Sequence, residues 1–182
     1  SQIFLRDTIA NATTLVSQEI GGDAGNGASS QPTISDNGRY VAFTSLATTL
    51  APTPNGSGSQ IFLRDTIGNA TTLVSREIGG DAGNGASSQP TISADGGFVA
   101  FTSLATTLAP TPGGSGTQIF LHNTQTNTTT LVSQTAVGGG AGSGASSQPT
   151  ISANGGFAAF SSVSTNLGAP GGGSQIYVRA LL

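Results

Sequence analysis

The sequence predicts an all-β protein built from repeats, and two observations support this prediction. First, the segment Ser-Gln-Ile-Phe-Leu at Ser1 recurs at Ser59, and as Thr-Gln-Ile-Phe-Leu at Thr117, so the repeat length is 58 residues. Second, apolar and β-branched residues occur in short runs separated by turn sequences rich in Gly, Asn and Asp, which is typical of strands. No window shows helical periodicity, so we expect almost no helix.

The repeats account for the whole chain as a single domain, residues 1–182. They span residues 1–58, 59–116 and 117–173, and a partial repeat at 174–182 begins with another Ser-Gln-Ile. The first two repeats differ at only seven positions, which indicates recent duplication or deliberate construction. Because the sequence starts with neither an initiator Met nor a signal peptide, we expect a processed, excised or engineered segment.

Each repeat contains four predicted strands. In the first repeat they occupy Gln2–Asp7, Thr13–Ser17, Pro32–Ser35 and Arg39–Ser45. Tight turns join the first strand to the second and the third to the fourth. The latter turn contains Asn37-Gly38, which favours a type I′ hairpin because both residues tolerate a positive φ.

Two longer connectors, Gln18–Gln31 and Leu46–Ser59, are rich in Gly, Thr and Pro. In an antiparallel meander both would lie on the side opposite the tight turns, and we expect this long-loop face to be the contact surface. Alternation within the strands predicts six buried side chains, with equivalents in the later repeats: Ile3, Leu5, Leu15, Ile34, Val41 and Phe43.

A four-stranded repeat is the unit of a β-propeller, in which such repeats form blades around an axis. The motifs Gln-Pro-Thr-Ile-Ser, Asn/Asp-Gly, Tyr/Phe-Val-Ala-Phe-Thr-Ser and Gln-Ile-Phe-Leu-Arg-Asp resemble the WD40-like repeats of TolB-type propellers over essentially the whole chain. The resemblance implies that the strands a, b, c and d of a blade, from innermost to outermost, are Pro32–Ser35, Arg39–Ser45, Gln2–Asp7 and Thr13–Ser17.

The resemblance implies a fold and not an activity. A β-solenoid is one alternative, although its coils are usually shorter, about 20–29 residues. A β-sandwich is another, but it does not explain near-identical repeats. We therefore predict a propeller-like, open-ended chain of three four-stranded antiparallel blades.

Charge is scarce in this chain. Charged residues make up 7%, with five Arg and Lys together against eight acidic residues, for a net charge of −3. Such a surface cannot hold a phosphate backbone, so we expect no nucleic-acid partner. No apolar run approaches the roughly 18 residues of a transmembrane helix, so we expect no membrane span. The chain has no cysteine, and its many Ser and Thr residues suit an extracellular or cell-surface location.

No residue pattern indicates catalysis, a cofactor or a metal. His122 is the only histidine and stands where other repeats have Arg6 and Arg64, so we expect an outward-facing strand residue. The third repeat contains no Asp or Glu, which excludes acid–base chemistry repeated in every blade. The glycine-rich segment Gly21–Gly27 offers one carboxylate, whereas calcium takes about six to eight oxygen ligands. We predict a protein that is not an enzyme.

Four Asn-x-Ser/Thr sequons are candidate glycosylation sites: Asn11, Asn55, Asn69 and Asn127. Three of them fall at the same tight turn of the repeat. The alternative interpretation is structural, since Asn suits the turn and Thr suits the strand that follows.

The strand order places both ends of the chain part-way through a blade. The chain begins with strands c and d and ends on an extra strand c, and three blades cannot close a ring because propellers have about four to eight. We therefore expect a homo-oligomer or filament in which the N-terminal strands of one chain join the C-terminal blade of another. The expected assembly residues are Gln2, Ile3, Phe4, Leu5, Thr14, Leu15, Val16, Gln175, Ile176, Tyr177 and Val178.

These observations predict a non-catalytic, extracellular, structural or self-assembling repeat protein whose partner is itself. One alternative is a binding module that presents its long-loop face to a glycan or a protein. Another is an engineered or excised propeller fragment.

Overall fold

The computed structural model describes residues 1–53, 56–110, 114–168 and 173–181. These residues form thirteen strands and no helix, which confirms the predicted all-β class. In chain order the strands are β1 (Phe4–Asp7), β2 (Ala12–Leu15), β3 (Ser29–Ile34), β4 (Tyr40–Ser45), β5 (Gln60–Asp65), β6 (Ala70–Leu73), β7 (Ser87–Ile92), β8 (Phe98–Ser103), β9 (Gln118–Asn123), β10 (Thr128–Leu131), β11 (Ser146–Ile151), β12 (Phe157–Ser162) and β13 (Gln175–Ala180). The described residues contain no helix that could cross a bilayer.

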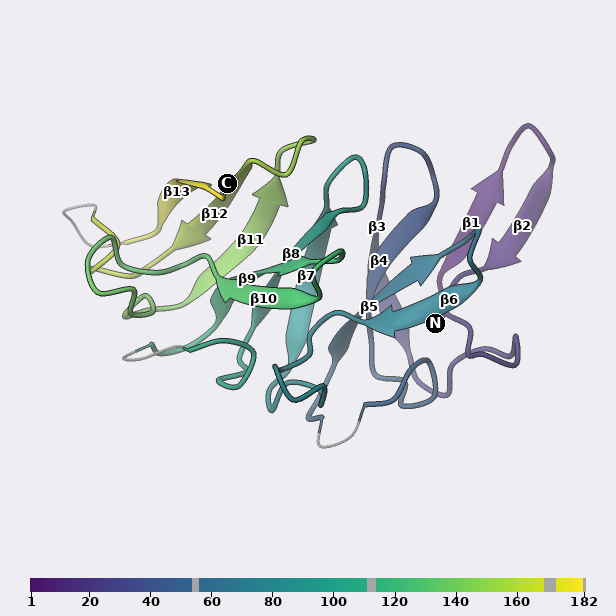
Figure 1. The fold of residues 1–182 in the computed structure, drawn as a ribbon, viewed down its shortest axis with the longest axis horizontal. Coiled ribbons are helices and arrows are strands. Elements are labelled where there is room, and N and C mark those ends of the chain that lie inside the picture. The colour runs from purple at the N-terminus through teal and green to yellow at the C-terminus, as the bar shows by residue number, and fades with distance from the viewer. Residues whose placement is uncertain (54–55, 111–113, 169–172, 182) are drawn as a thin grey trace.

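The strands form four sheets that stand in a row (Figure 1). The first blade consists of β1 and β2, the second of β3 to β6, the third of β7 to β10, and the fourth of β11 to β13. Consecutive strands pair antiparallel, so each sheet is a meander. Each complete blade takes strands a and b from one repeat and c and d from the next. This arrangement confirms the predicted propeller-like fold.

Aromatic pairs repeat at the centre of the blades. Phe43 on β4 lies opposite Phe62 on β5, with ring centroids 6.0 Å apart. The third blade repeats this pair, and the fourth blade has Phe160 and Tyr177 at 5.7 Å. Such pairs contribute about 0.5–1.5 kcal/mol beyond the area they bury. They hold strands b and c of each blade together.

Most of the predicted core is buried between blades. Ile3, Val41 and Phe43 are buried, and Leu5 and Leu15 are partly buried. One face of each blade packs on the opposite face of the next, which explains why apolar residues are needed on both faces of a strand.

Ile34 does not follow the prediction. Its side chain is 46% exposed, whereas its equivalent Ile92 in the third blade is 9% exposed. The first blade has strands c and d only, so no strand b lies over Ile34, whereas Tyr40 at the start of β4 packs in the cluster that buries Ile92.

Two local features differ from the predicted strands and turns. Strand a begins at Ser29 and not at the predicted Pro32. Gln31 has a φ of 53°, and the pairing with strand b shifts register between Ser30 and Thr33, so the strand contains a β-bulge and continues across it. In the following turn Gly38 has a φ of 71°, but Asn37 is not among the described residues with positive φ. The turn is therefore not type I′; the Asn37 side chain instead accepts a hydrogen bond from the Arg39 N–H at 3.0 Å.

Candidate functional site

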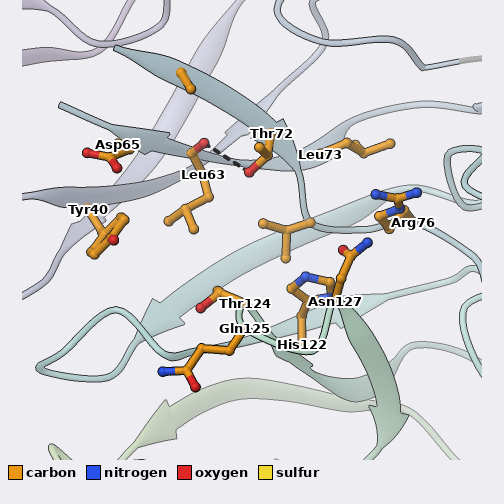
Figure 2. Close-up of a pocket in the computed structure, with 12 residues that line it drawn as sticks. Tyr40, Leu63, Asp65, Thr72, Leu73, Arg76, His122, Thr124, Gln125 and Asn127 are labelled. Carbon is orange, nitrogen blue, oxygen red and sulfur yellow. Dashed lines mark hydrogen bonds between the residues drawn. The ribbon is translucent and has the colours of Figure 1, made fainter. Parts of the chain in front are cut away.

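A cleft repeats at each junction between blades, where strand d of one blade meets strand c of the next. The largest, about 430 Å³, lies between the second and third blades, and Figure 2 shows the residues around it. The equivalent clefts at the first and last junctions are about 160 Å³ and 300 Å³. We call the largest one the junction cleft; it is bounded by Tyr40, Leu73, Arg76, His122, Thr124 and Asn127.

The first junction shows how the repeat ordinarily fills this space. Arg64 on β5 is only 2% exposed, and it donates hydrogen bonds to Thr71 Oγ1 at 3.0 Å and to Asn69 Oδ1. Thr71 in turn donates to the Gln18 carbonyl oxygen of the preceding blade at 3.1 Å. Burial lowers the pKa of Arg64. The guanidinium is thus hydrogen-bonded to neighbouring side chains and occupies part of the space, which leaves a cleft of about 160 Å³.

His122 takes the place of this arginine at the junction cleft. Its side chain is 4% exposed, and Nδ1 lies 3.0 Å from Thr129 Oγ1. The prediction of an outward-facing residue is therefore wrong, because strand c packs against the preceding blade. Burial, reinforced by the nearby charge of Arg76, lowers the pKa of His122 to about 4, so the imidazole is neutral at pH 7. The imidazole is shorter than an arginine side chain, which leaves the cleft open.

Arg76 stands where the preceding repeat has Gln18. Arg76 lies at one edge of the cleft, on the side of Asn127 (Figure 2), and its guanidinium lies close to Gly80 of its own loop. The positive charge that Arg64 buries at the first junction is therefore placed on the wall of the cleft at the second.

Tyr40 and Asp65 form the opposite wall. Asp65 makes a salt bridge with Arg39 at 2.7 Å, and the guanidinium carbon lies 4.9 Å from the centre of the Tyr40 ring. The hydrogen bond from Arg39 lowers the pKa of Asp65 to about 2, so this carboxylate stays ionised. Gly96, with a φ of 76°, lies against the Tyr40 ring, where a Cβ atom would come within 2.2 Å of a ring carbon. The Tyr40 ring thus contacts both the Arg39 guanidinium and the turn at Gly96.

The lining of the cleft is part apolar and part polar. Leu63, Leu73 and Val74 are the apolar part of the lining, while Thr124 and Asn127 belong to its polar part. No group of three or more His, Cys, Asp or Glu side chains that could hold a metal occurs among the described residues. The cleft therefore offers one guanidinium, one neutral imidazole, one carboxylate that is paired with Arg39, and several hydrogen-bonding and apolar side chains.

Three of the four predicted glycosylation sites lie in the turns between strands c and d. Asn11, Asn69 and Asn127 have φ values of 53° to 55°, a conformation that Asn tolerates. The side-chain oxygens of Asn11 and Asn69 accept hydrogen bonds from Arg6 and Arg64. These roles support the structural interpretation of the three turns, and glycosylation stays a prediction. Asn55 lies outside the described residues.

The predicted assembly residues fall into two groups. Ile3 and Val16 are buried against the second blade, and Tyr177 stacks on Phe160 within the fourth. Three others face outward at the two ends of the row, with exposed fractions of 61% for Phe4, 74% for Ile176 and 67% for Val178. The remaining residues of the set lie on the same three strands, β1, β2 and β13, or directly beside them.

The junction cleft was not predicted from the sequence, although a signal for it existed. Arg76 is one of the seven differences between the first two repeats, and His122 is the departure from arginine in strand c. The two positions are 46 residues apart in sequence, and only the packing of strand d against the next strand c brings them to one cleft.

No protein-family model and no curated protein matches the sequence. Solved structures share the fold. TolB from Acinetobacter baumannii has a TM-score of 0.56 at 17% identity, covering 99% of this chain and 35% of that one. A putative TolB from Agrobacterium tumefaciens has a TM-score of 0.60 at 14% identity, covering 100% of this chain and 53% of that one. Dipeptidyl peptidase 4 from Porphyromonas gingivalis has a TM-score of 0.55 at 17% identity, and the match covers 90% of this chain and 25% of that one.

These similarities confirm the resemblance predicted from the sequence, a TolB-type β-propeller fold. This chain spans 35% and 53% of the length of the two TolB structures. At such low identities the similarity shows the fold alone.

Proposed function

We propose that this chain is a non-catalytic structural propeller segment that assembles head to tail with a second copy of itself, at an extracellular or cell-surface location. The observation that carries the proposal is a contrast between equivalent side chains. Phe4 is 61% exposed, whereas its equivalent Phe62 is 0% exposed; Ile176 is 74% exposed, whereas Ile61 is 0% exposed. Apolar side chains that are buried in the inner blades are therefore exposed to solvent at the two ends of the row.

The two exposed ends are complementary in the strands that they lack. At the N-terminal end, an apolar groove of about 200 Å³ runs beside β1 and is lined by Phe4, Pro32 and Ile34. Inside the chain the corresponding place is taken by strand b, which brings Tyr40 over Ile92. The fourth blade supplies such a strand, β12, and lacks a strand d, which β2 of a second copy would provide.

Strand exchange would join these ends. β13 occupies the position beside β12 that β1 of the second copy would take, and the two segments are nearly alike, Gln-Ile-Tyr-Val-Arg against Gln-Ile-Phe-Leu-Arg. Exchanging them conserves the pairing with β12, and it also adds β2 as an outer strand and covers Phe4. Each large apolar side chain that becomes fully buried contributes about 1.5–3 kcal/mol, so the exchange favours assembly.

A hydrogen-bond ladder along the inner strands supports the same direction of assembly. Gln31 Oε1 accepts a hydrogen bond from the Gln89 N–H at 2.9 Å, and Gln89 Oε1 accepts one from the Gln148 N–H at 3.0 Å. The donor and acceptor occupy the same place in every repeat. The ladder can therefore continue from Gln148 of one copy to the Gln31 N–H of the next.

A second, backbone ladder runs in the opposite sense. The Asp36 N–H donates to the Ala94 carbonyl at 3.0 Å, and the Ala94 N–H donates to the Ala153 carbonyl at 2.9 Å. The next contact in this series joins the Ala153 N–H of one copy to the Asp36 carbonyl of the other. Donors and acceptors at the two ends thus match in type and order.

The binding-module alternative has less support. All aromatic side chains of the chain lie in strands, so the long connectors offer no ring on which a sugar could stack. The few charges and the many hydroxyl side chains support the extracellular or cell-surface part of the proposal.

The proposal is tested by measuring molar mass with light scattering for the chain and two single variants. Phe4→Ser removes an apolar side chain from the proposed interface and should weaken self-association by about ten- to hundredfold. Ile9→Ser is the matched control, because Ile9 is 97% exposed at the c–d turn, away from the groove. Equal self-association of the two variants, or a chain that stays monomeric at micromolar concentration, would contradict the proposal.

A further inference from the structure

We propose that the junction cleft binds a small organic monocarboxylate with an apolar face. The cleft lies within one chain, between its second and third blades, so this inference does not depend on self-assembly. It rests on the comparison of one repeated space at three junctions.

The first step is that the cleft departs from the repeat pattern at two facing positions. Relative to the first junction, Gln18 is replaced by Arg76 and Arg64 by His122. One replacement removes the side chain that fills the space, and the other puts a guanidinium on its wall. The cleft is about 430 Å³, against about 160 Å³ at the first junction and about 300 Å³ at the last, which keeps the first junction's pair as Gln134 and Arg179 but has a fourth blade of three strands. A volume of about 430 Å³ is within the range of small-molecule sites, about 300–1,000 Å³.

The second step concerns hydrogen-bonding groups that the replacements release. At the first junction Asn69 Oδ1 accepts from Arg64. The equivalent Asn127 has no side-chain hydrogen bond within the described residues, since His122 bonds to Thr129 instead. Asn127 and Arg76 lie on the same side of the cleft, next to the imidazole (Figure 2). A carboxylate placed there would receive charge-assisted hydrogen bonds from Arg76 and a further one from the amide of Asn127.

The third step sets the ligand's charge and shape. Arg76 is the one cation on the cleft wall, while Asp65 contributes a carboxylate on the opposite wall that is already paired with Arg39. A second negative charge on the ligand would face Asp65, so the site favours a single carboxylate. Leu73, Val74 and the Tyr40 ring present an apolar surface, which favours a ligand with a flat or apolar body.

His122 provides a direct probe of binding. The charged groups that face it across the cleft are Arg76, from the segment after β6, and Asp65 with its partner Arg39. A bound carboxylate would offset the effect of Arg76 and raise the pKa of His122. The pKa of His122 should therefore be higher in the complex than in the free protein.

The experiment follows the Hε1 proton of His122 by NMR while the 182-residue chain is titrated with two probes, benzoate and D-glucuronate. Because His122 is the only histidine, its resonance needs no assignment by mutation. We expect a saturable shift with benzoate below about 10 mM, and none with the uncharged analogues benzyl alcohol and D-glucose. A shift with D-glucuronate and none with benzoate would contradict the apolar face proposed for the ligand. No shift with either acid would overturn the proposal.

Two variants restore residues that the repeat already accommodates. Arg76→Gln recreates the first repeat at this position and should weaken binding by about ten- to hundredfold. His122→Arg should fill the cleft and abolish binding, measured by calorimetry because the NMR probe is lost. Arg6→Gln, on exposed β1, is the matched control and should bind like the unmodified chain. Unchanged binding in Arg76→Gln and His122→Arg would show that the ligand sits elsewhere and refute the proposal.

Discussion

The packing of the blades makes a quantitative prediction about two phenylalanines at the same position of the repeat. Phe62 is 0% exposed, stacks on Phe43 at 6.0 Å and lies in the cluster between the first and second blades. Its replacement by Ala removes a whole ring from a tightly packed place, for which about 3–5 kcal/mol is expected. Phe4 is 61% exposed and has no such ring opposite, so Phe4→Ala should cost less than about 1 kcal/mol in a dissociated chain.

The assay is urea unfolding of both variants at several protein concentrations, with the free energy of unfolding taken from the midpoint and slope. At low concentration the two costs should differ as stated. At concentrations where the chain self-associates, the cost of Phe4→Ala should rise, because the interface then buries this ring. A Phe62→Ala cost below about 1 kcal/mol would refute the packing reasoning, because a buried, stacked ring cannot be lost so cheaply.

Three further predictions concern charge and metal. The pKa of His122 is about 4 in the folded protein, below its ordinary 6.5, so the unfolded chain binds more protons between these two values. The free energy of unfolding should therefore fall as the pH drops from about 6.5 to about 4. Urea unfolding at several pH values should show that His122→Gln removes this part of the loss. The pKa of Asp65 is lowered from 3.8 to about 2, so its contribution is present above pH 4 and lost as pH falls toward 2; Arg39→Gln should flatten this acid limb. EDTA should leave the melting temperature unchanged, because the third repeat builds the glycine-rich loop of Gly21–Gly27 without a carboxylate, and a drop of several degrees would contradict this.

The strands were predictable because their signals are local. Alternation and glycine-containing turns located every strand, and β5 (Gln60–Asp65) matches the predicted strand c of the repeat. The bulge at Gln31 was missed, because a non-glycine residue at positive φ leaves no mark in the sequence. The bulge has a role in the contact between blades, where the Gln31 side chain accepts a hydrogen bond from the backbone N–H of Gln89.

The burial of a side chain could be predicted from the sequence only where the residues that cover it belong to the same repeat. Ile34 and Ile92 end the same segment, Ser-Ser-Gln-Pro-Thr-Ile, yet the first is exposed because its blade has an incomplete neighbour. His122 was expected to face outward for a similar reason: the strand pattern does not reveal which face meets the preceding blade. The junction cleft combines residues from two blades, so it required the tertiary arrangement as well as the substitutions.

The central claim is that the bare end blades are completed by a second copy of the chain. Native mass spectrometry or light scattering of residues 1–182 at micromolar concentration tests it most directly, with a chain lacking Ser1–Ser17 measured alongside. We predict dimers or larger assemblies for the full chain, and loss of assembly on deletion while the β-signature in circular dichroism is retained. A stable, soluble monomer of the full chain, with β1 and β13 both unpaired at their outer edges, would contradict the claim.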